Sequence, residues 1–194
     1  IRDAVLRFYG PEPRHSPDYG RIVSERHHRR LVALLKDAGE PYLGGQADEA
    51  SRYIAPTILR GVSPDSAIMT EEIFGPILPV LTVKSPQEAI AFVTARDKPL
   101  ALYVFSEDSA VTEQVLASTS SGGVCVNGTI LHVGNPELPF GGVGPSGMGV
   151  YHGRSSFDTF SHHKAVLQRS TRFDIPLMYP PFAGWMRKLL AKLL

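Results

Sequence analysis

Apolar side chains recur every three or four residues in several stretches of the chain, which is the pattern of amphipathic helices. In other stretches they run consecutively and include many β-branched residues, as in strands that are covered on both faces. These patterns predict helices at residues 1–9, 24–38, 86–96 and 109–118, and extended segments at 53–62, 77–83, 102–105, 124–126 and 160–168. Because strands and helices alternate from residue 77 onward, we expect an α/β fold with a largely parallel sheet flanked by helices.

Local signals sharpen several of these elements. Ser85, Pro86 and Glu88 form a capping box, with serine at the N-cap, proline at the first helical position and glutamate three residues on. Pro56 interrupts the apolar run at 53–62 and predicts an edge or irregular strand there. The basic run at 26–30 could attract an anion, but we interpret it as a solvated helix face, because a charge cluster alone carries little specificity.

The composition excludes several classes of protein. The chain has 194 residues, 43% of them hydrophobic, and a formal net charge of +1, which is typical of a globular domain and not of a nucleic-acid-binding protein. No apolar run approaches the ~18 residues that a membrane span requires. The single cysteine, Cys125, excludes an internal disulfide and a multi-cysteine metal site, and it predicts a reducing, cytoplasmic location.

Several motifs suggest chemistry that their context does not support. Residues 142–147 match the spelling G-x-G-x-x-G, but no strand precedes them and Pro145 lies inside them, so we interpret the glycines as turn residues. Ser146 lacks the glycine spacing of a hydrolase nucleophile. His162 and His163 would point to opposite faces of a strand and cannot share a metal ion. Cys125 lies in a short apolar strand, which favours an inert thiol.

Six segments in combination resemble the class 3 branch of the NAD(P)-dependent aldehyde dehydrogenases, over roughly residues 1–180. They are Y-I-A-P-T at 53–57, E-E-I-F-G-P at 71–76, K-P-L-A-L-Y at 98–103, L-P-F-G-G at 138–142 continuing to G-M-G at 147–149, Y-H-G at 151–153 and S-F-D-T-F-S at 156–161. The family oxidises aldehydes to carboxylic acids through a cysteine thiohemiacetal, with hydride transfer to NAD or NADP and hydrolysis of the resulting thioester.

The resemblance implies roles for two residues near the cofactor. Glu72 would accept hydrogen bonds from the hydroxyls of the nicotinamide ribose, and Phe74 would pack beside the nicotinamide ring. Adjacent glutamates in extended chain face opposite ways, so Glu71 is expected to turn elsewhere. Without the resemblance, the two glutamates are typical of a capped turn.

Ile130, Val133, Phe140 and His152 match positions that line the family's aldehyde tunnel. An apolar tunnel favours medium or long aliphatic or aromatic aldehydes, because each buried methylene contributes about 0.8 kcal/mol. These residues lie in or next to the stretch 131–153, which is rich in glycine and proline, shows no helical or strand period and is expected to be an irregular loop. The alternative is that these four side chains fill the core behind that loop.

The resemblance also shows what this chain lacks. The family's nucleophilic cysteine, in a G-Q-x-C context, the general-base glutamate and the nucleotide-binding domain would all lie upstream of Ile1, and Cys125 does not replace the nucleophile. No catalytic residue is therefore assigned. Together with the absence of an initial Met, this predicts the C-terminal part of a longer enzyme that is inactive alone. Asn127-Gly128 stands where relatives usually carry Asn-Asp.

The expected organisation has three parts: a portion of the catalytic domain at 1–159, an oligomerisation strand at 160–170 and a tail at 171–194. The strand implies a homodimer formed by pairing with a partner's sheet. In the tail, apolar residues fall on one helical face opposite basic ones, which indicates either peripheral contact with an anionic membrane or packing on the parent protein. The apolar residues are Trp185, Met186, Leu189, Leu190, Leu193 and Leu194, and the basic ones are Arg187, Lys188 and Lys192.

Two other functions remain open from the sequence. A truncated module that dimerises with full-length subunits would contribute no chemistry, and the coding sequence upstream of Ile1 would distinguish it from the enzyme. A reductive enzyme of the same superfamily acting on acyl phosphates would keep the fold, but the E-E-I-F-G-P context disfavours it. The sequence does not reveal the physiological aldehyde or the preference between NAD and NADP.

Overall fold

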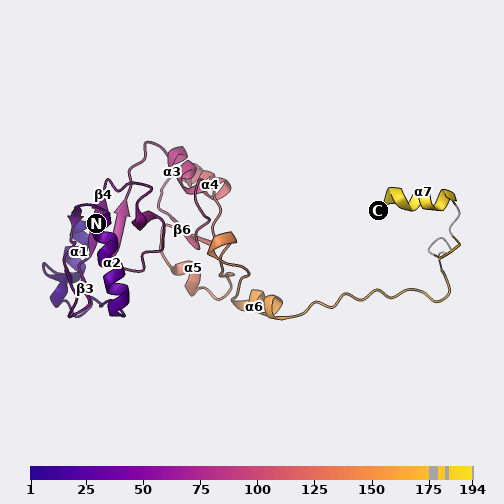
Figure 1. Ribbon diagram of the computed structural model, residues 1–194, viewed down its shortest axis with the longest axis horizontal. Coiled ribbons are helices and arrows are strands. Elements are labelled where there is room, and N and C mark those ends of the chain that lie inside the picture. The colour runs from indigo at the N-terminus through magenta and orange to yellow at the C-terminus, as the bar shows by residue number, and fades with distance from the viewer. Residues whose placement is uncertain (175–178, 182–183, 194) are drawn as a thin grey trace. The chain divides into compact units, whose positions relative to one another are not determined.

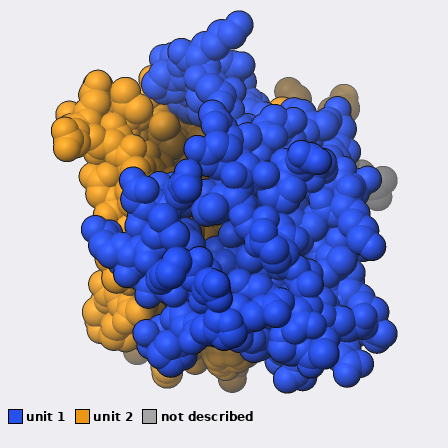
Figure 2. All heavy atoms as spheres, turned by 90° about the vertical axis from the view of Figure 1, so that its left-hand side faces the viewer, with its two compact units in different colours: residues 1–93 blue, residues 94–194 orange. Residues whose placement is uncertain are grey.

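The computed structural model describes residues 1–174, 179–181 and 184–193, and it forms two compact units, residues 1–93 and 94–194 (Figures 1 and 2). The first unit holds α1 (Arg2–Tyr9), α2 (Glu25–Asp37), β1 (Pro41–Leu43), β2 (Ala47–Asp48), β3 (Tyr53–Ile54), β4 (Thr57–Arg60), β5 (Ile77–Val80) and most of α3 (Pro86–Thr94). The second holds β6 (Ala101–Val104), α4 (Ser109–Ser118), β7 (Gly123–Val126), α5 (Leu131–Gly134), α6 (Gly153–Phe160) and α7 (Gly184–Leu193). Short 3-10 turns lie at Pro13–His15, Ala67–Met69 and Gly144–Ser146.

Helix α2 carries the main apolar face of the first unit. The Ser24 side chain caps the helix by accepting a hydrogen bond from the backbone N–H of His27, and the helix ends before Gly39, whose φ of +91° suits glycine. Its buried side chains join residues of β3, β4, β5 and the turn at Ala67–Met69 in one core, as the apolar stripe predicted. The core consists of Leu31, Leu34, Leu35, Ile54, Leu59, Val62, Ile68 and Ile77.

The three-stranded sheet of the first unit has the order β1-β4-β5. Strand β4 pairs parallel with β5, with Thr57 opposite Ile77, and antiparallel with β1. The segment at 53–62 was predicted to be an edge or an irregular strand. The irregular alternative is confirmed, since the segment is divided into β3 and β4, and β4 lies in the centre of the sheet and not at its edge. Pro56 falls between β3 and β4, so its missing N–H removes no hydrogen bond from the sheet.

Tyr19 ties the loop between α1 and α2 to this core. Its phenol donates a 2.7 Å hydrogen bond to the carbonyl of Ile54, and its ring packs edge-on against Tyr9 and Tyr53, at 5.0 and 5.8 Å between ring centres. Burial raises the pKa of the Tyr19 phenol above its usual range, so the hydroxyl keeps its proton and stays a donor.

The second unit contains the predicted strand–helix–strand repeat. Strands β6 and β7 pair in parallel, and α4 connects them with exactly the predicted bounds, capped by the Asp108 carboxylate. Of the strand pairs within the described residues, β4–β5 and β6–β7 are parallel, whereas β1–β4 and β2–β3 are antiparallel. The α/β fold is confirmed, but the three-stranded sheet is mixed and the β2–β3 pair is antiparallel. The expectation of a largely parallel sheet missed this, because the sequence pattern did not reveal the short strands β1 and β2.

The predicted capping box at the start of α3 is formed with a shift of one residue on one side, since Glu88 bonds to the residue before the N-cap. The Ser85 hydroxyl accepts a hydrogen bond from the backbone N–H of Glu88, and the Glu88 carboxylate accepts one from the backbone N–H of Lys84. The helix begins at Pro86 as predicted and ends at Thr94, two residues before the predicted end.

The end of the chain differs from the prediction. Phe160 is the last residue of α6, and residues 162–170 take no regular secondary structure, so the strand predicted at 160–168 is not formed by this chain alone (Figure 1). A strand needs a neighbouring strand for its backbone hydrogen bonds, and the described residues supply none here. A role of this segment in oligomerisation stays a prediction.

Helix α7 forms within the predicted amphipathic tail, and Trp185 is exposed. Leu194 and the side chains of Arg187, Leu189, Leu190 and Leu193 lie outside the described residues, so the proposed apolar face of the tail stays a prediction. Among the described helices, none is long and apolar enough to cross a bilayer.

Candidate functional site

The turn at 70–75 carries both residues assigned to the cofactor, Glu72 and Phe74. Phe74 has a positive φ of +51° and an exposed ring, 72% accessible. Gly75 lies directly against α2, since a Cβ added there would come within 2.6 Å of Leu31 Cδ1. Ile73 packs against the core of the first unit. The turn is thus pressed against the helix while its two candidate side chains face solvent.

Arg30 and His27 of α2 hold this turn by its backbone. The Arg30 guanidinium donates to the carbonyls of Glu72 and Ile73, and its Nε donates to His27 Nδ1 at 3.3 Å. His27 Nε2 lies 2.7 Å from the carbonyl oxygen of Phe74. These contacts fit the tautomer with hydrogen on Nε2, which donates to Phe74 while Nδ1 accepts from Arg30.

The interpretation of residues 26–30 as a solvated face is therefore wrong for three of its members. His28 is only 2% exposed, and its Nε2 lies 3.0 Å from the carbonyl oxygen of Tyr53. His27 and Arg30 are three residues apart and share the face of the helix that meets the turn. That spacing is the sequence signal that could have identified them; only Arg26 and Arg29 of the run are exposed.

The two glutamates of the turn have different surroundings. The Glu71 carboxylate pairs with Arg30 at 2.9 Å, whereas the Glu72 carboxylate is exposed and no residue in the described part of the chain pairs with it. The Glu71 carboxylate is thus directed toward Arg30 of α2, and its direction relative to the cofactor stays a prediction. Glu72 presents a carboxylate on a fixed backbone, which is the geometry needed to accept hydrogen bonds from a ligand.

In the second unit, Phe140 and His152 come together across a short antiparallel bridge. Phe140 and Tyr151 exchange two backbone hydrogen bonds of 2.9 Å each. The rings of Phe140 and His152 stack with their centres 5.9 Å apart and an angle of 23° between planes. His152 has a φ of +88° and its backbone N–H donates to the Ser156 hydroxyl, which fixes the entry into α6.

Ile130 directly precedes the single helical turn α5, and Val133 lies within that turn. Ile130 is 66% exposed in a left-handed conformation, φ +66°, and its carbonyl accepts the N–H of Val133 at 2.8 Å. Val133 is half-buried. Between them lies His132, a buried residue that no sequence motif identified, whose ring centre is 6.2 Å from that of Phe140. No periodicity marks it, because α5 is a single turn.

The glycine-rich stretch at 142–147 is a turn, as predicted. The Ser146 hydroxyl accepts from the N–H of Val143 and donates to its carbonyl, so it is used within the turn. A Cβ on Gly142 would lie 2.1 Å from the Ser146 carbonyl oxygen, which explains the need for glycine. The preceding strand and following helix of a dinucleotide fingerprint are missing at this turn.

Cys125 is a free, half-buried thiol on β7. Across the described ranges 1–174, 179–181 and 184–193, no group of three His, Cys, Asp or Glu side chains could hold a metal ion.

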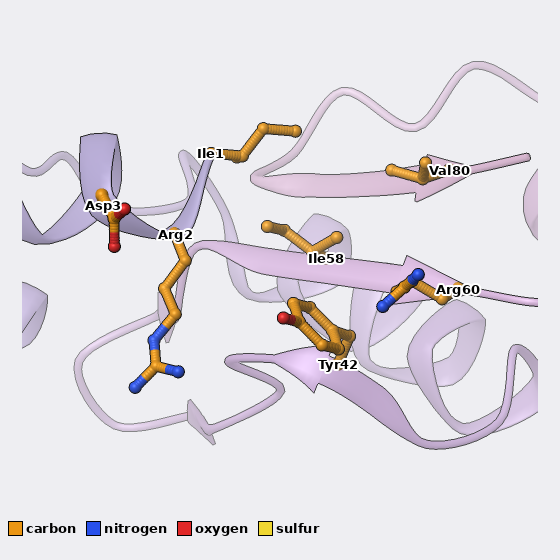
Figure 3. Close-up of a pocket in the computed structure, with 7 residues that line it drawn as sticks. All are labelled: Ile1, Arg2, Asp3, Tyr42, Ile58, Arg60 and Val80. Carbon is orange, nitrogen blue, oxygen red and sulfur yellow. The ribbon is translucent and has the colours of Figure 1, made fainter.

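One pocket of about 430 Å³ lies on the sheet of the first unit (Figure 3). Among the lining residues, the Arg60 guanidinium lies over the Tyr42 ring, 4.8 Å from the ring centre. Neither Glu72 nor Phe74 lines this pocket, so it is separate from the candidate cofactor turn. Its lining residues are Ile1, Arg2, Asp3, Tyr42, Ile58, Arg60 and Val80.

Comparison with known proteins decides the family. The sequence profile described as "Aldehyde dehydrogenase family" matches residues 6–166, which include the turn at 70–75, α5 and the Phe140–Tyr151 bridge. The chain belongs to the aldehyde dehydrogenase family. The resemblance inferred from the sequence motifs is thereby confirmed.

Curated aldehyde dehydrogenases match almost the whole chain. The 4,4'-diaponeurosporen-aldehyde dehydrogenase of Staphylococcus aureus is 53% identical over 185 residues, covering 95% of this chain and 40% of that protein. The mouse "aldehyde dehydrogenase, dimeric NADP-preferring" is 50% identical over 183 residues, covering 93% of this chain and 40% of that protein. The chain thus spans about 40% of the length of these relatives.

A solved aldehyde dehydrogenase has the same fold. The structure described as the substrate-bound state of Staphylococcus aureus AldH superposes with a TM-score of 0.81 at 50% identity, covering all of this chain and 42% of that one. This agreement confirms the α/β fold of an aldehyde dehydrogenase.

Proposed function

We propose that this chain is part of an NAD(P)-dependent aldehyde dehydrogenase that oxidises hydrophobic aldehydes to carboxylic acids. Its contribution is a clamp for the nicotinamide ribose and one wall of the aldehyde tunnel. The observation that carries the proposal is the arrangement of the turn at 70–75. Arg30 forms an ion pair with Glu71 and hydrogen bonds to the turn's backbone carbonyls, while the Glu72 carboxylate stays exposed.

The residues of this turn fit NAD or NADP. A carboxylate can accept hydrogen bonds from both hydroxyls of a ribose, and charge-assisted bonds of this kind are strong. The exposed Phe74 ring supplies a flat apolar surface for the nicotinamide. NAD or NADP held by this turn would supply the hydride acceptor for the oxidation. The residues of the turn suit the nicotinamide ribose, which NAD and NADP share. The mouse relative whose name describes it as NADP-preferring supports the use of NADP.

The aldehyde is proposed to be hydrophobic because three of the four tunnel residues, Ile130, Val133 and Phe140, are apolar. The fourth tunnel residue, His152, stacks on the ring of Phe140. Each methylene that an apolar wall removes from water contributes about 0.8 kcal/mol, which corresponds to about a fourfold gain in kcat/KM per methylene.

We further propose a homodimer through residues 160–170, where Val166 and Leu167 are exposed and the backbone has no partner strand among the described residues. The name of the mouse relative describes that protein as dimeric. The tail is proposed to make peripheral contact with an anionic membrane surface or with the rest of a cytoplasmic enzyme.

A non-catalytic dimerisation module is the second candidate function. The observation in its favour is that Cys125, the single cysteine of the chain, is half-buried on β7 and lies outside the G-Q-x-C context of the family's nucleophile.

The testing experiment measures formation of reduced nicotinamide by the full-length protein that carries this chain, with a series of unbranched aldehydes. We expect kcat/KM to rise severalfold with each added methylene until the tunnel is filled. The isolated 194-residue chain is expected to show no turnover. A flat chain-length profile would contradict the hydrophobic tunnel. Turnover by the isolated chain that is abolished by Cys125→Ala would contradict the assignment of the nucleophile to another segment.

A further inference from the structure

His132 is a buried histidine whose ring packs as an aromatic side chain. It is 8% exposed and lies on the single turn of α5. Its ring centre is 5.9 Å from that of Tyr103, in an edge-on arrangement, and 6.2 Å from that of Phe140. Within the described part of the chain, neither ring nitrogen has a hydrogen-bond partner. The ring is therefore held by its apolar and aromatic contacts.

Strand β7 carries a glycine where this ring lies. A Cβ added to Gly123 would come within 2.7 Å of His132 Cδ2, closer than such atoms approach, and within 3.1 Å of Nε2, which is a tight contact. The absence of a side chain at Gly123 thus provides the space for the imidazole, which packs against Tyr103 of β6 and the bridge residue Phe140. This close fit fixes the ring, and with it the turn of α5, against the sheet.

The same ring links two parts of the proposed tunnel wall. On one side, His132 lies between Ile130 and Val133 in the chain, so its anchoring determines where the α5 turn holds them. On the other side it contacts Phe140, whose ring stacks on His152. All four residues assigned to the tunnel therefore depend on His132, although none of those assignments involves it.

We propose that His132 is a positioning residue that sets the shape of the aldehyde tunnel by ring packing, and so contributes to specificity for the aldehyde. This inference rests on the proposed function. It requires that His132 shapes the tunnel through the packing of its ring and not through a hydrogen bond from a ring nitrogen. It also requires that the effect falls on the aldehyde and leaves the cofactor unaffected, because the ring of His132 contacts Tyr103, Gly123 and Phe140 and not the turn at 70–75.

Two substitutions in the full-length enzyme separate these requirements. His132→Phe keeps a flat ring in the site, whereas His132→Gln keeps a polar group and removes the ring. We expect His132→Phe to retain kcat/KM for an aromatic aldehyde within about threefold. We expect His132→Gln to raise KM for that aldehyde about tenfold, since it loses both aromatic contacts, and to leave KM for NAD(P)+ unchanged. His15→Gln, at an exposed histidine outside the proposed tunnel, cofactor turn and dimer segment, serves as the matched control.

A second measurement does not depend on turnover. Ring signals of labelled Phe140 in the NMR spectrum are expected to shift strongly in His132→Gln and little in His132→Phe. Rescue by glutamine but not by phenylalanine, or an equal rise in KM for aldehyde and cofactor, would overturn the proposal, as would unchanged Phe140 signals in His132→Gln. A wild-type enzyme without aldehyde turnover would instead refute the proposed function, and the Phe140 signals would still decide the packing role of His132.

Discussion

Replacing Glu72 with glutamine is expected to lower kcat for aldehyde oxidation by the full-length enzyme about a hundredfold. The Glu72 carboxylate is exposed on a turn whose backbone is held by α2, so in our account it is free to accept two hydrogen bonds from the ribose. Glutamine keeps one acceptor oxygen and loses the charge, and hydrogen bonds to charged groups contribute about 1.5–3 kcal/mol each. Steady-state kinetics with saturating NAD(P)+ measures the loss.

Glu71→Gln is the matched control for this substitution. It removes one carboxylate from the neighbouring position, but that carboxylate pairs with Arg30 in a partly exposed ion pair. Such pairs contribute about 0–1 kcal/mol, so we expect at most a fivefold change in kcat. If Glu71→Gln were as damaging as Glu72→Gln, or if Glu72→Gln retained wild-type kcat, the ribose-binding role of Glu72 would be wrong.

Arg30→Ala is expected to raise KM for NAD(P)+ and lower kcat, by about tenfold each. The Arg30 side chain donates to the Glu72 and Ile73 carbonyls, pairs with Glu71 and donates to His27, so its removal frees the turn at the point where Glu72 is held. A misplacement of about 1 Å in a positioned group costs up to a hundredfold in rate. Arg30→Lys is not expected to restore activity, because one ammonium cannot reproduce the planar fork of donors.

Arg29→Ala tests whether loss of positive charge on α2 explains the result. Arg29 is exposed and its pair with Glu49, at 3.5 Å, does not involve the turn. We expect this variant to keep the wild-type kinetic constants within about twofold. Equal effects of the two alanine variants would show that general charge on the helix, and not the clamp on residues 71–74, supports cofactor binding.

Local chemistry made much of the fold predictable from the sequence. The Ser24 cap and the Ser85 capping box marked the starts of α2 and α3, and the bounds of α4 were predicted correctly. The errors have physical causes. Helix α6 begins after His152, whose φ of +88° is a backbone conformation that a histidine in the sequence does not predict. The helix includes Phe160, where we expected a strand. The central position of β4 depends on β1, whose three residues carry no strand pattern.

The site was less accessible to sequence reasoning than the fold. The motifs identified Glu72, Phe74 and the tunnel residues, and their roles stay predictions. Three residues that organise the site were missed or misinterpreted: His27 and Arg30, which looked like part of a basic surface, and His132, which looked like part of an irregular loop. Each acts through contacts with residues distant in the chain, such as Phe74 for His27 and Tyr103 for His132. Such contacts leave no periodic pattern.

The most direct test of the central claim is a crystal structure of the full-length enzyme that carries this chain, bound to NAD(P)+. Our account predicts that both Glu72 carboxylate oxygens lie within about 2.7–2.9 Å of hydroxyls of the nicotinamide ribose, with the turn still bound to Arg30. A complex in which the ribose hydroxyls bind other groups, with the Glu72 carboxylate facing solvent, would contradict it.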